Sequence, residues 1–135
     1  MKKIILILTL SLLAISCDVN DDSNYSFQLN PVYQVEMPSK FAKDSITNIP
    51  VKYLSPSTCH VFNNFYYDAY QFDRIVAIET VKLNQNNCQA DNETVVEVQL
   101  KFRPVTLGTY HFKFWTGEND LGEDQYLEYN VVVDH

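Results

Sequence analysis

The sequence predicts an all-β fold for residues 25–135, an antiparallel sandwich of about seven strands. Apolar and polar residues alternate with a period of two along several segments. Short stretches rich in Pro, Gly, Asn and Asp separate these segments. No segment after residue 24 shows the apolar spacing of an amphipathic helix. Together these observations indicate one domain of half-buried strands.

The chain begins with a segment typical of a cleaved signal helix. Lysines at positions 2 and 3 precede a twelve-residue apolar run from Ile4 to Ile15. As a helix this run would span about 18 Å, whereas a hydrocarbon core is about 30 Å thick. We therefore expect residues 1–16 to be removed.

The end of this segment, Ala14-Ile15-Ser16-Cys17, resembles the lipobox of bacterial lipoproteins. The resemblance implies that Cys17 becomes the first residue of the mature chain and that its thiol carries diacylglycerol. It also implies a lipid-anchored protein in the cell envelope of a Gram-negative bacterium, at the outer membrane. Ala14 and Ser16 satisfy the small-x-small rule of ordinary signal cleavage as well, so secretion without a lipid is the alternative.

Residues 17–24 are polar and acidic, and we expect them to form a flexible tether. Asp18, Asp21 and Asp22 are similar to the acidic signals that send some lipoproteins to the outer face of the outer membrane. A plain solvated linker has the same composition. Surface exposure is therefore one of two interpretations.

The predicted strands follow in order. Early segments group alternate residues on one face: Tyr25, Phe27 and Leu29; Tyr33, Val35 and Met37; Ile49, Val51 and Tyr53. Residues 74–83 are apolar on both faces, as a central strand would be. The clearest alternation comes later and predicts three inner rows: Thr94, Val96, Val98, Leu100 and Phe102; Tyr110, Phe112 and Phe114; Leu127, Tyr129, Val131 and Val133.

The segment LGTYHF, residues 107–112, resembles the tyrosine corner of immunoglobulin folds through Gly108 and Tyr110. The resemblance implies an immunoglobulin-like architecture and says nothing about function. Phe112 stands where the second core cysteine of such domains would be. A disulfide of the usual inter-sheet kind is therefore not expected.

The chain has three cysteines, and lipidation of Cys17 would leave Cys59 and Cys88. In an oxidising compartment these two are expected to form a disulfide that staples the loop around Cys88, the alternative being two free buried thiols. We predict no metal site and no cofactor, because the chain has no CxxC pair and its three histidines are scattered.

The charge balance is acidic, with a formal net charge of −7. Loss of residues 1–16 removes two lysines and leaves eight basic against 17 acidic side chains, a net charge of −9. Such a potential repels phosphate backbones and anionic head groups. Nucleic acid is therefore not an expected partner, and the membrane is expected only through the N-terminal lipid.

Candidate partner-binding residues come from the aromatic segment at 62–72. Rings and amides together suit a sugar or peptide groove, and the candidates are Asn64, Tyr66, Tyr67 and Tyr70. The alternative is that these rings fill the core and cover strand edges. The single tryptophan, Trp115, faces away from the core row by strand phase and is either a partner anchor or covered by the next loop.

Other chemistry has weaker signals. The acidic loop with Glu118, Asp120, Glu123 and Asp124 lacks EF-hand spacing and is typical of a solvated turn, with calcium as the alternative. There is no GxSxG elbow and no phosphate-cradling glycine loop, so we do not expect an enzyme. The sequence predicts a non-catalytic binding or accessory module for a protein or glycan partner. The alternative is a lipid-anchored hydrolase that uses His60 with Asp68 or Asp73.

Overall fold

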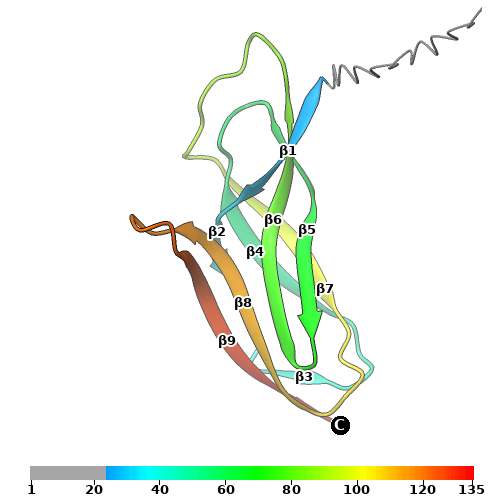
Figure 1. Ribbon diagram of the computed structural model, residues 1–135. Helices are drawn as coiled ribbons and strands as arrows, with labels where there is room; N and C mark the ends of the chain where they lie inside the picture. Colours follow the sequence, from blue (N-terminus) through cyan, green and yellow to red (C-terminus); the bar gives the residue numbers. More distant parts are fainter. Residues whose placement is uncertain (1–23) are drawn as a thin grey trace, which may run out of the picture.

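The computed structural model describes residues 24–135, so the predicted signal helix (1–16) and nearly all of the tether lie outside the described residues. Nine β-strands and no helix are found in this part of the chain, which confirms the predicted all-β fold. A membrane-spanning helix is accordingly absent from residues 24–135. The strands form two sheets that face each other as a sandwich (Figure 1).

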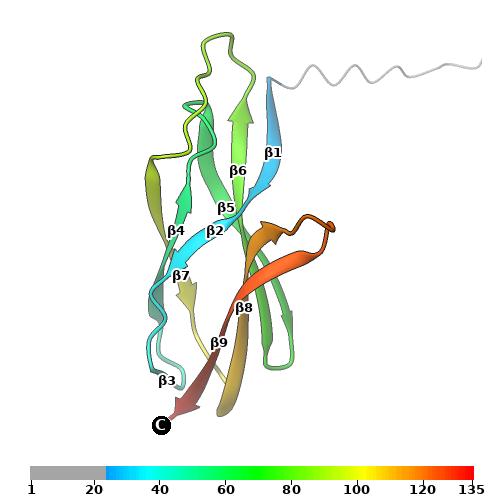
Figure 2. The same cartoon turned by 90° about the vertical axis from the view of Figure 1, so that its left-hand side faces the viewer.

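The larger sheet contains six strands and the smaller one three. The larger sheet has β1 (Tyr25–Asn30), β3 (Lys40–Ala42), β5 (His60–Tyr70), β6 (Asp73–Leu83), β8 (Gly108–Glu118) and β9 (Asp124–Asp134). The smaller sheet has β2 (Val32–Val35), β4 (Thr47–Leu54) and β7 (Val95–Phe102), in the order β2-β4-β7. Figure 2 shows the two sheets side by side, with β1 standing clear of the smaller sheet.

Two features of this topology correct the predicted fold. The strands number nine in the described residues, whereas the sequence predicted about seven, in part because β3 has three residues and is too short to show a period. The sheets are also not purely antiparallel, since β3 pairs with β9, and β6 with β8, in parallel. These pairs join segments far apart in the chain, and no local pattern specifies them.

Strand β6 is the central strand of the larger sheet, as its apolar character predicted. It pairs with β5 along its length, and its other edge is shared by β8 near residues 73–76 and by β1 near residues 78–83. Val76, Ala77 and Ile78 are buried on both faces as a result. This arrangement leaves β5 paired on one edge alone.

The core lies between the inner faces of the two sheets. The predicted inner rows of β4, β7, β8 and β9 all contribute to it, and the largest fully buried side chains include Tyr53, Phe41, Phe112 and Phe114. One predicted row is wrong: in β2 it is Val32 and Val35 that are buried, while Tyr33 is exposed. A register shift between Val32 and Gln34 changes the phase of the strand at this point.

The Cys59–Cys88 disulfide is present, and it lies at the end of the sandwich where β1 begins. It joins the chain just before β5 to the loop between β6 and β7, as expected for a loop staple. Backbone bonds reinforce it, with Thr58 N donating to Gln89 O at 3.0 Å and Asp91 N donating to Pro56 O at 3.0 Å. The two loops therefore act as one unit.

At the opposite end, Gly108 allows the β5–β6 hairpin to pack against the start of β8. Its φ is +141°, and a Cβ there would lie 2.9 Å from a ring carbon of Phe72. The Phe72 ring packs edge-on against Tyr110 at 5.1 Å, and Phe72 O accepts a bond from His111 N at 3.0 Å. Glycine is required here because both the backbone conformation and the space exclude a side chain.

Candidate binding site

The structure separates the predicted partner-binding residues instead of bringing them together. Asn64 and Tyr67 line a cavity between β5 and β7. Tyr66 and Trp115 line a second cavity on the outer face of the larger sheet. Tyr70 lies at the end of β5, is 70% exposed and lines neither cavity. Neighbouring residues of a strand point to opposite faces, so Tyr66 and Tyr67 cannot share one site.

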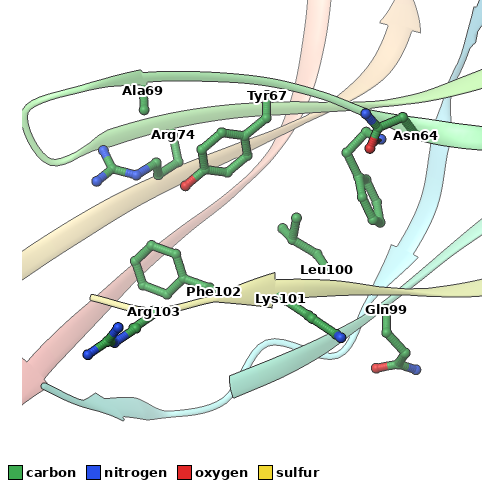
Figure 3. Close-up of a pocket in the computed structure, with 10 residues that line it drawn as sticks. Asn64, Tyr67, Ala69, Arg74, Gln99, Leu100, Lys101, Phe102 and Arg103 are labelled. Carbon is green, nitrogen blue, oxygen red and sulfur yellow. Dashed lines mark hydrogen bonds between the residues drawn. The ribbon is translucent and has the colours of Figure 1, made fainter. Parts of the chain in front are cut away.

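The first cavity, called the edge groove here, has a volume of about 580 Å³. It lies between two strands that are each paired on one side only, since β5 pairs with β6 and β7 with β4. Figure 3 shows Tyr67 on one wall and the Leu100 and Phe102 side chains opposite, while Gln99 and Lys101 point away. The groove therefore combines an apolar floor with two unpaired strand edges.

Both arginines of the sequence, Arg74 and Arg103, stand at one end of the edge groove (Figure 3). The Arg74 guanidinium lies over the Tyr110 ring at 4.9 Å, and its Nη1 donates to Gln71 O at 2.8 Å and to Asp73 O at 2.7 Å. Arg103 Nε donates to Asp44 O at 3.1 Å. These contacts hold both guanidinium groups in place.

The electrostatics of the edge groove are opposite to those of the chain as a whole. No acidic side chain lines it, and within residues 24–135 neither arginine forms an ion pair with a carboxylate. By contrast, Lys40, Lys52 and Lys113 are all paired with acidic side chains. Burial raises the pKa of Tyr67, and the nearby Arg74 charge opposes part of that rise. The groove thus offers positive charge that no carboxylate of the described residues pairs with.

The second cavity, called the outer groove here, has a volume of about 390 Å³. Its aromatic residues are Tyr66, Trp115 and Tyr126, and its carboxylates are Glu118 and Asp124. Trp115 is half-buried, and its Nε1 donates to Asp124 Oδ1 at 2.7 Å. Burial raises the pKa of Tyr126, and Asp124 contributes to the rise. The indole is held in a fixed position at the surface.

The acidic loop beyond Trp115 is organised by its own side chains. Asn119 Oδ1 accepts bonds from Leu121 N at 2.9 Å and Glu123 N at 3.0 Å, and Asn119 Nδ2 donates to Glu123 Oε2 at 2.9 Å. Over residues 24–135, no group of three His, Cys, Asp or Glu side chains is placed to hold a metal ion. The loop therefore has the contacts of a turn.

His60 lies at the opposite end of β5 from the carboxylates suggested for it. The register pairs His60 with Lys82 and Asp68 with Ile75, which places Asp68 about 26 Å farther along the strand. The contacts of the His60 ring are instead Ser57 Oγ at Nδ1, 2.7 Å away, and Gln28 Oε1 at Nε2, 2.8 Å away. In the neutral tautomer that fits these partners, Ser57 donates to Nδ1 and Nε2 donates to Gln28.

Partial burial lowers the pKa of His60, and the Lys82 charge lowers it further. A depressed folded-state pKa means that neutral His60 contributes stability above its ordinary pKa of about 6.5, and this stability is lost as the pH falls through the folded value. We expect the free energy of unfolding to fall between pH 7.5 and 5.5. Urea titrations measure it, and the fall should disappear in His60→Gln but persist in His111→Gln. A fall of equal size in all three proteins would contradict this assignment.

Sequence reasoning missed the two arginines and Phe65, Leu100 and Phe102 as groove residues. Arg74 begins a predicted strand and Arg103 follows the inner row that ends at Phe102, yet the sequence does not show that β5 and β7 face each other across an open side. Strand parity separates Tyr66 from Tyr67, as the structure does, but it groups Asn64 with Tyr66, whereas Asn64 lines the edge groove with Tyr67. Comparisons with protein-family models, curated proteins and solved structures found no match. The chemistry of the two grooves is therefore the basis for assigning a function.

Proposed function

We propose that the protein is a lipid-anchored module of a Gram-negative cell envelope, attached to the outer membrane through Cys17, that binds a partner without catalysing a reaction. The lipobox-like residues 14–17 and the acidic segment after them support the anchor and leave room for display at the cell surface. We further propose an immunoglobulin-like relationship for the sandwich. The buried Tyr110 two residues after Gly108 supports it.

Within this proposal, the edge groove takes an extended acidic segment of a partner protein. One observation carries the assignment: both arginines of an acidic chain stand without carboxylate partners between two unpaired strand edges. Unpaired edges offer backbone donors and acceptors to an added strand. Guanidinium groups held in place bind carboxylates with little loss of conformational freedom. Backbone pairing would supply affinity, and the arginines would supply preference for acidic side chains.

An NMR titration with a synthetic peptide of alternating valine and glutamate tests this assignment. We expect saturable shifts of the β5 and β7 backbone amides, with much weaker shifts for a peptide in which lysine replaces glutamate. Arg103→Gln should weaken binding by at least about tenfold, the lower limit for the loss of one charge-assisted hydrogen bond. Lys113→Gln, a matched loss of charge on β8, should change nothing. Equal binding of both peptides, or equal weakening by both substitutions, would rule the assignment out.

A glycan partner is the second candidate, and the outer groove favours it. Aromatic faces stack on the apolar faces of sugar rings, and carboxylates accept bonds from hydroxyl groups. Trp115 is the only tryptophan of the sequence, so its fluorescence reports this groove alone. A saturable emission change with oligosaccharides, together with no amide shifts at the edge groove, would favour the glycan over the peptide.

The hydrolase alternative would use His60 as a base. The neighbours of its ring are Ser57 and Gln28, and Ser57 is 9% exposed. A substrate would have to displace one of them to reach the imidazole. The edge groove needs no such rearrangement, which is why we favour binding.

A further inference from the structure

A second apolar surface lies at the end of the domain where β1 begins. Tyr25, Phe27 and Leu29 project from the outer face of β1 and are 47%, 58% and 46% exposed. Val61 of β5 is 55% exposed, and the register aligns it with Phe27 through Val81 of β6. We call Tyr25, Phe27, Leu29 and Val61 the anchor-end patch. Apolar residues gathered this way on a small domain mark a contact surface.

The smaller sheet does not cover β1. In β1, all residues from Tyr25 to Leu29 are exposed and only Asn30 is buried. The Asn30 Nδ2 donates a hydrogen bond to Thr80 Oγ1. In Figure 2, β1 lies on the opposite side of the domain from β4 and β7. The inner side of β1 is polar, with Gln28 bonded to His60. The strand therefore presents its apolar side outward, and no layer formed by residues 24–135 covers it.

The patch carries no charged side chain, although the chain as a whole is acidic. Strand β1 has no charged residue, and neither has β5 from Val61 to Tyr67. The nearest carboxylate along the outer face is Glu79, which pairs with Leu29 in the register and accepts a bond from Asn63 at 2.6 Å. Farther along, Lys113 and Glu128 form an ion pair. The uncharged surface thus ends at Glu79.

The position of the patch relative to Cys17 suggests what covers it. Tyr25 lies eight positions after Cys17, a reach of at most about 28 Å for the chain. The hairpin end of β5 lies a further 30 Å or so away along an eleven-residue strand. An anchor at Cys17 therefore holds the anchor-end patch, and not the far end, close to the bilayer. This step rests on the lipid anchor of the proposed function.

From these observations we infer that the anchor-end patch lies on the bilayer that holds the lipid, with Tyr25 and Phe27 among the head groups. Tyrosine concentrates at membrane interfaces because it joins an apolar ring to a polar hydroxyl group, and the Phe27 ring adds apolar area beside Tyr25. The tether raises the effective concentration of bilayer next to the patch, so a weak contact is sufficient. The absence of charge in the patch favours zwitterionic lipid. The edge groove shares no lining residue with the anchor-end patch.

Fluorescence quenching in phosphatidylcholine vesicles tests the inference. Trp115→Phe provides a background without tryptophan, in which Phe27→Trp reports the patch. Tyr33→Trp is the matched control, because Tyr33 is 57% exposed but lies in β2 of the smaller sheet. With the native lipidated protein, we expect brominated phosphatidylcholine to quench the Phe27→Trp reporter at least about twofold more than the Tyr33→Trp reporter. Equal quenching of the two reporters would overturn the inference.

The same experiment separates failure of the patch from failure of the anchor. Intact mass shows whether the native chain starts at Cys17 and carries acyl groups. A chain without acyl groups would refute the anchor itself. In that event a chain produced from Cys17 onward can be joined through Cys17 to a maleimide phospholipid, because the other two cysteines are joined to each other. Preferential quenching in this conjugate supports the patch. In a second outcome, the protein binds vesicles but the Phe27→Trp reporter is not quenched there, and the reporter is shielded from solvent only in native envelopes. That outcome would show that the patch contacts a protein, and it would contradict a contact with lipid.

Discussion

Phe102→Ala is expected to lower the free energy of unfolding by about 3–5 kcal/mol. Phe102 is 4% exposed and joins the two sheets, with its ring centroid 4.9 Å from that of Phe41, 5.0 Å from Phe112 and 5.2 Å from Tyr110. The Arg74 guanidinium lies 5.9 Å from the same ring. Alanine would leave a cavity, because the neighbouring rings belong to two sheets and cannot all move inward to fill it.

Urea denaturation followed by circular dichroism measures this loss. Phe27→Ala is the matched control in a non-lipidated Cys17→Ser background, because Phe27 is 58% exposed and the same side chain is removed. Its effect should stay within about 0.5 kcal/mol. Similar losses for both variants would show that Phe102 does not have the central packing role described here.

Cys59→Ala combined with Cys88→Ala is expected to lower the free energy of unfolding by about 3–4 kcal/mol. The bridge closes a loop with a sequence separation of 29, and the chain-entropy relation gives this size for such a loop. Most of the effect arises because the unfolded chain gains freedom. The folded loops retain the Thr58 to Gln89 backbone bond.

Parallel urea titrations of the variant and the natural chain, each with and without a reductant, measure the contribution of the bridge. The reductant should destabilise the natural chain toward the variant and leave the variant unchanged. A difference below about 1 kcal/mol would mean that the loops hold each other without the bridge.

The strands that the sequence predicted well are those with one buried and one solvated face. In β7, Leu100 and Phe102 are buried while Gln99 and Lys101 are exposed. The period of two arises because one face of the strand packs inside the sandwich and the other faces solvent. Strand β1 has the same period but no layer over it, and its alternating row faces outward. A period of two reports that a strand has two different faces, and it does not report which of them is buried.

The binding residues were harder to predict, for a related reason. The aromatic segment at 62–72 has the composition of a groove, but as a strand it distributes its rings over two faces. Tyr67 reaches the edge groove, whereas Tyr66 joins Trp115 in the outer groove. Arg74 and Arg103 come together through pairings between distant segments, which composition and spacing do not reveal.

The parallel pairing of β3 with β9 has a consequence for how the chain acquires its structure. Lys40 aligns with Val132, so this part of the larger sheet cannot form until nearly all of the described chain is available. Long-range pairing of this kind makes folding slow, because the chain loses entropy by closing a long loop before the stabilising contacts between the strands can form. A chain that stays unfolded through synthesis is suited to crossing a membrane as an extended polypeptide. Under the envelope location proposed above, the topology of the larger sheet would delay folding until export is complete.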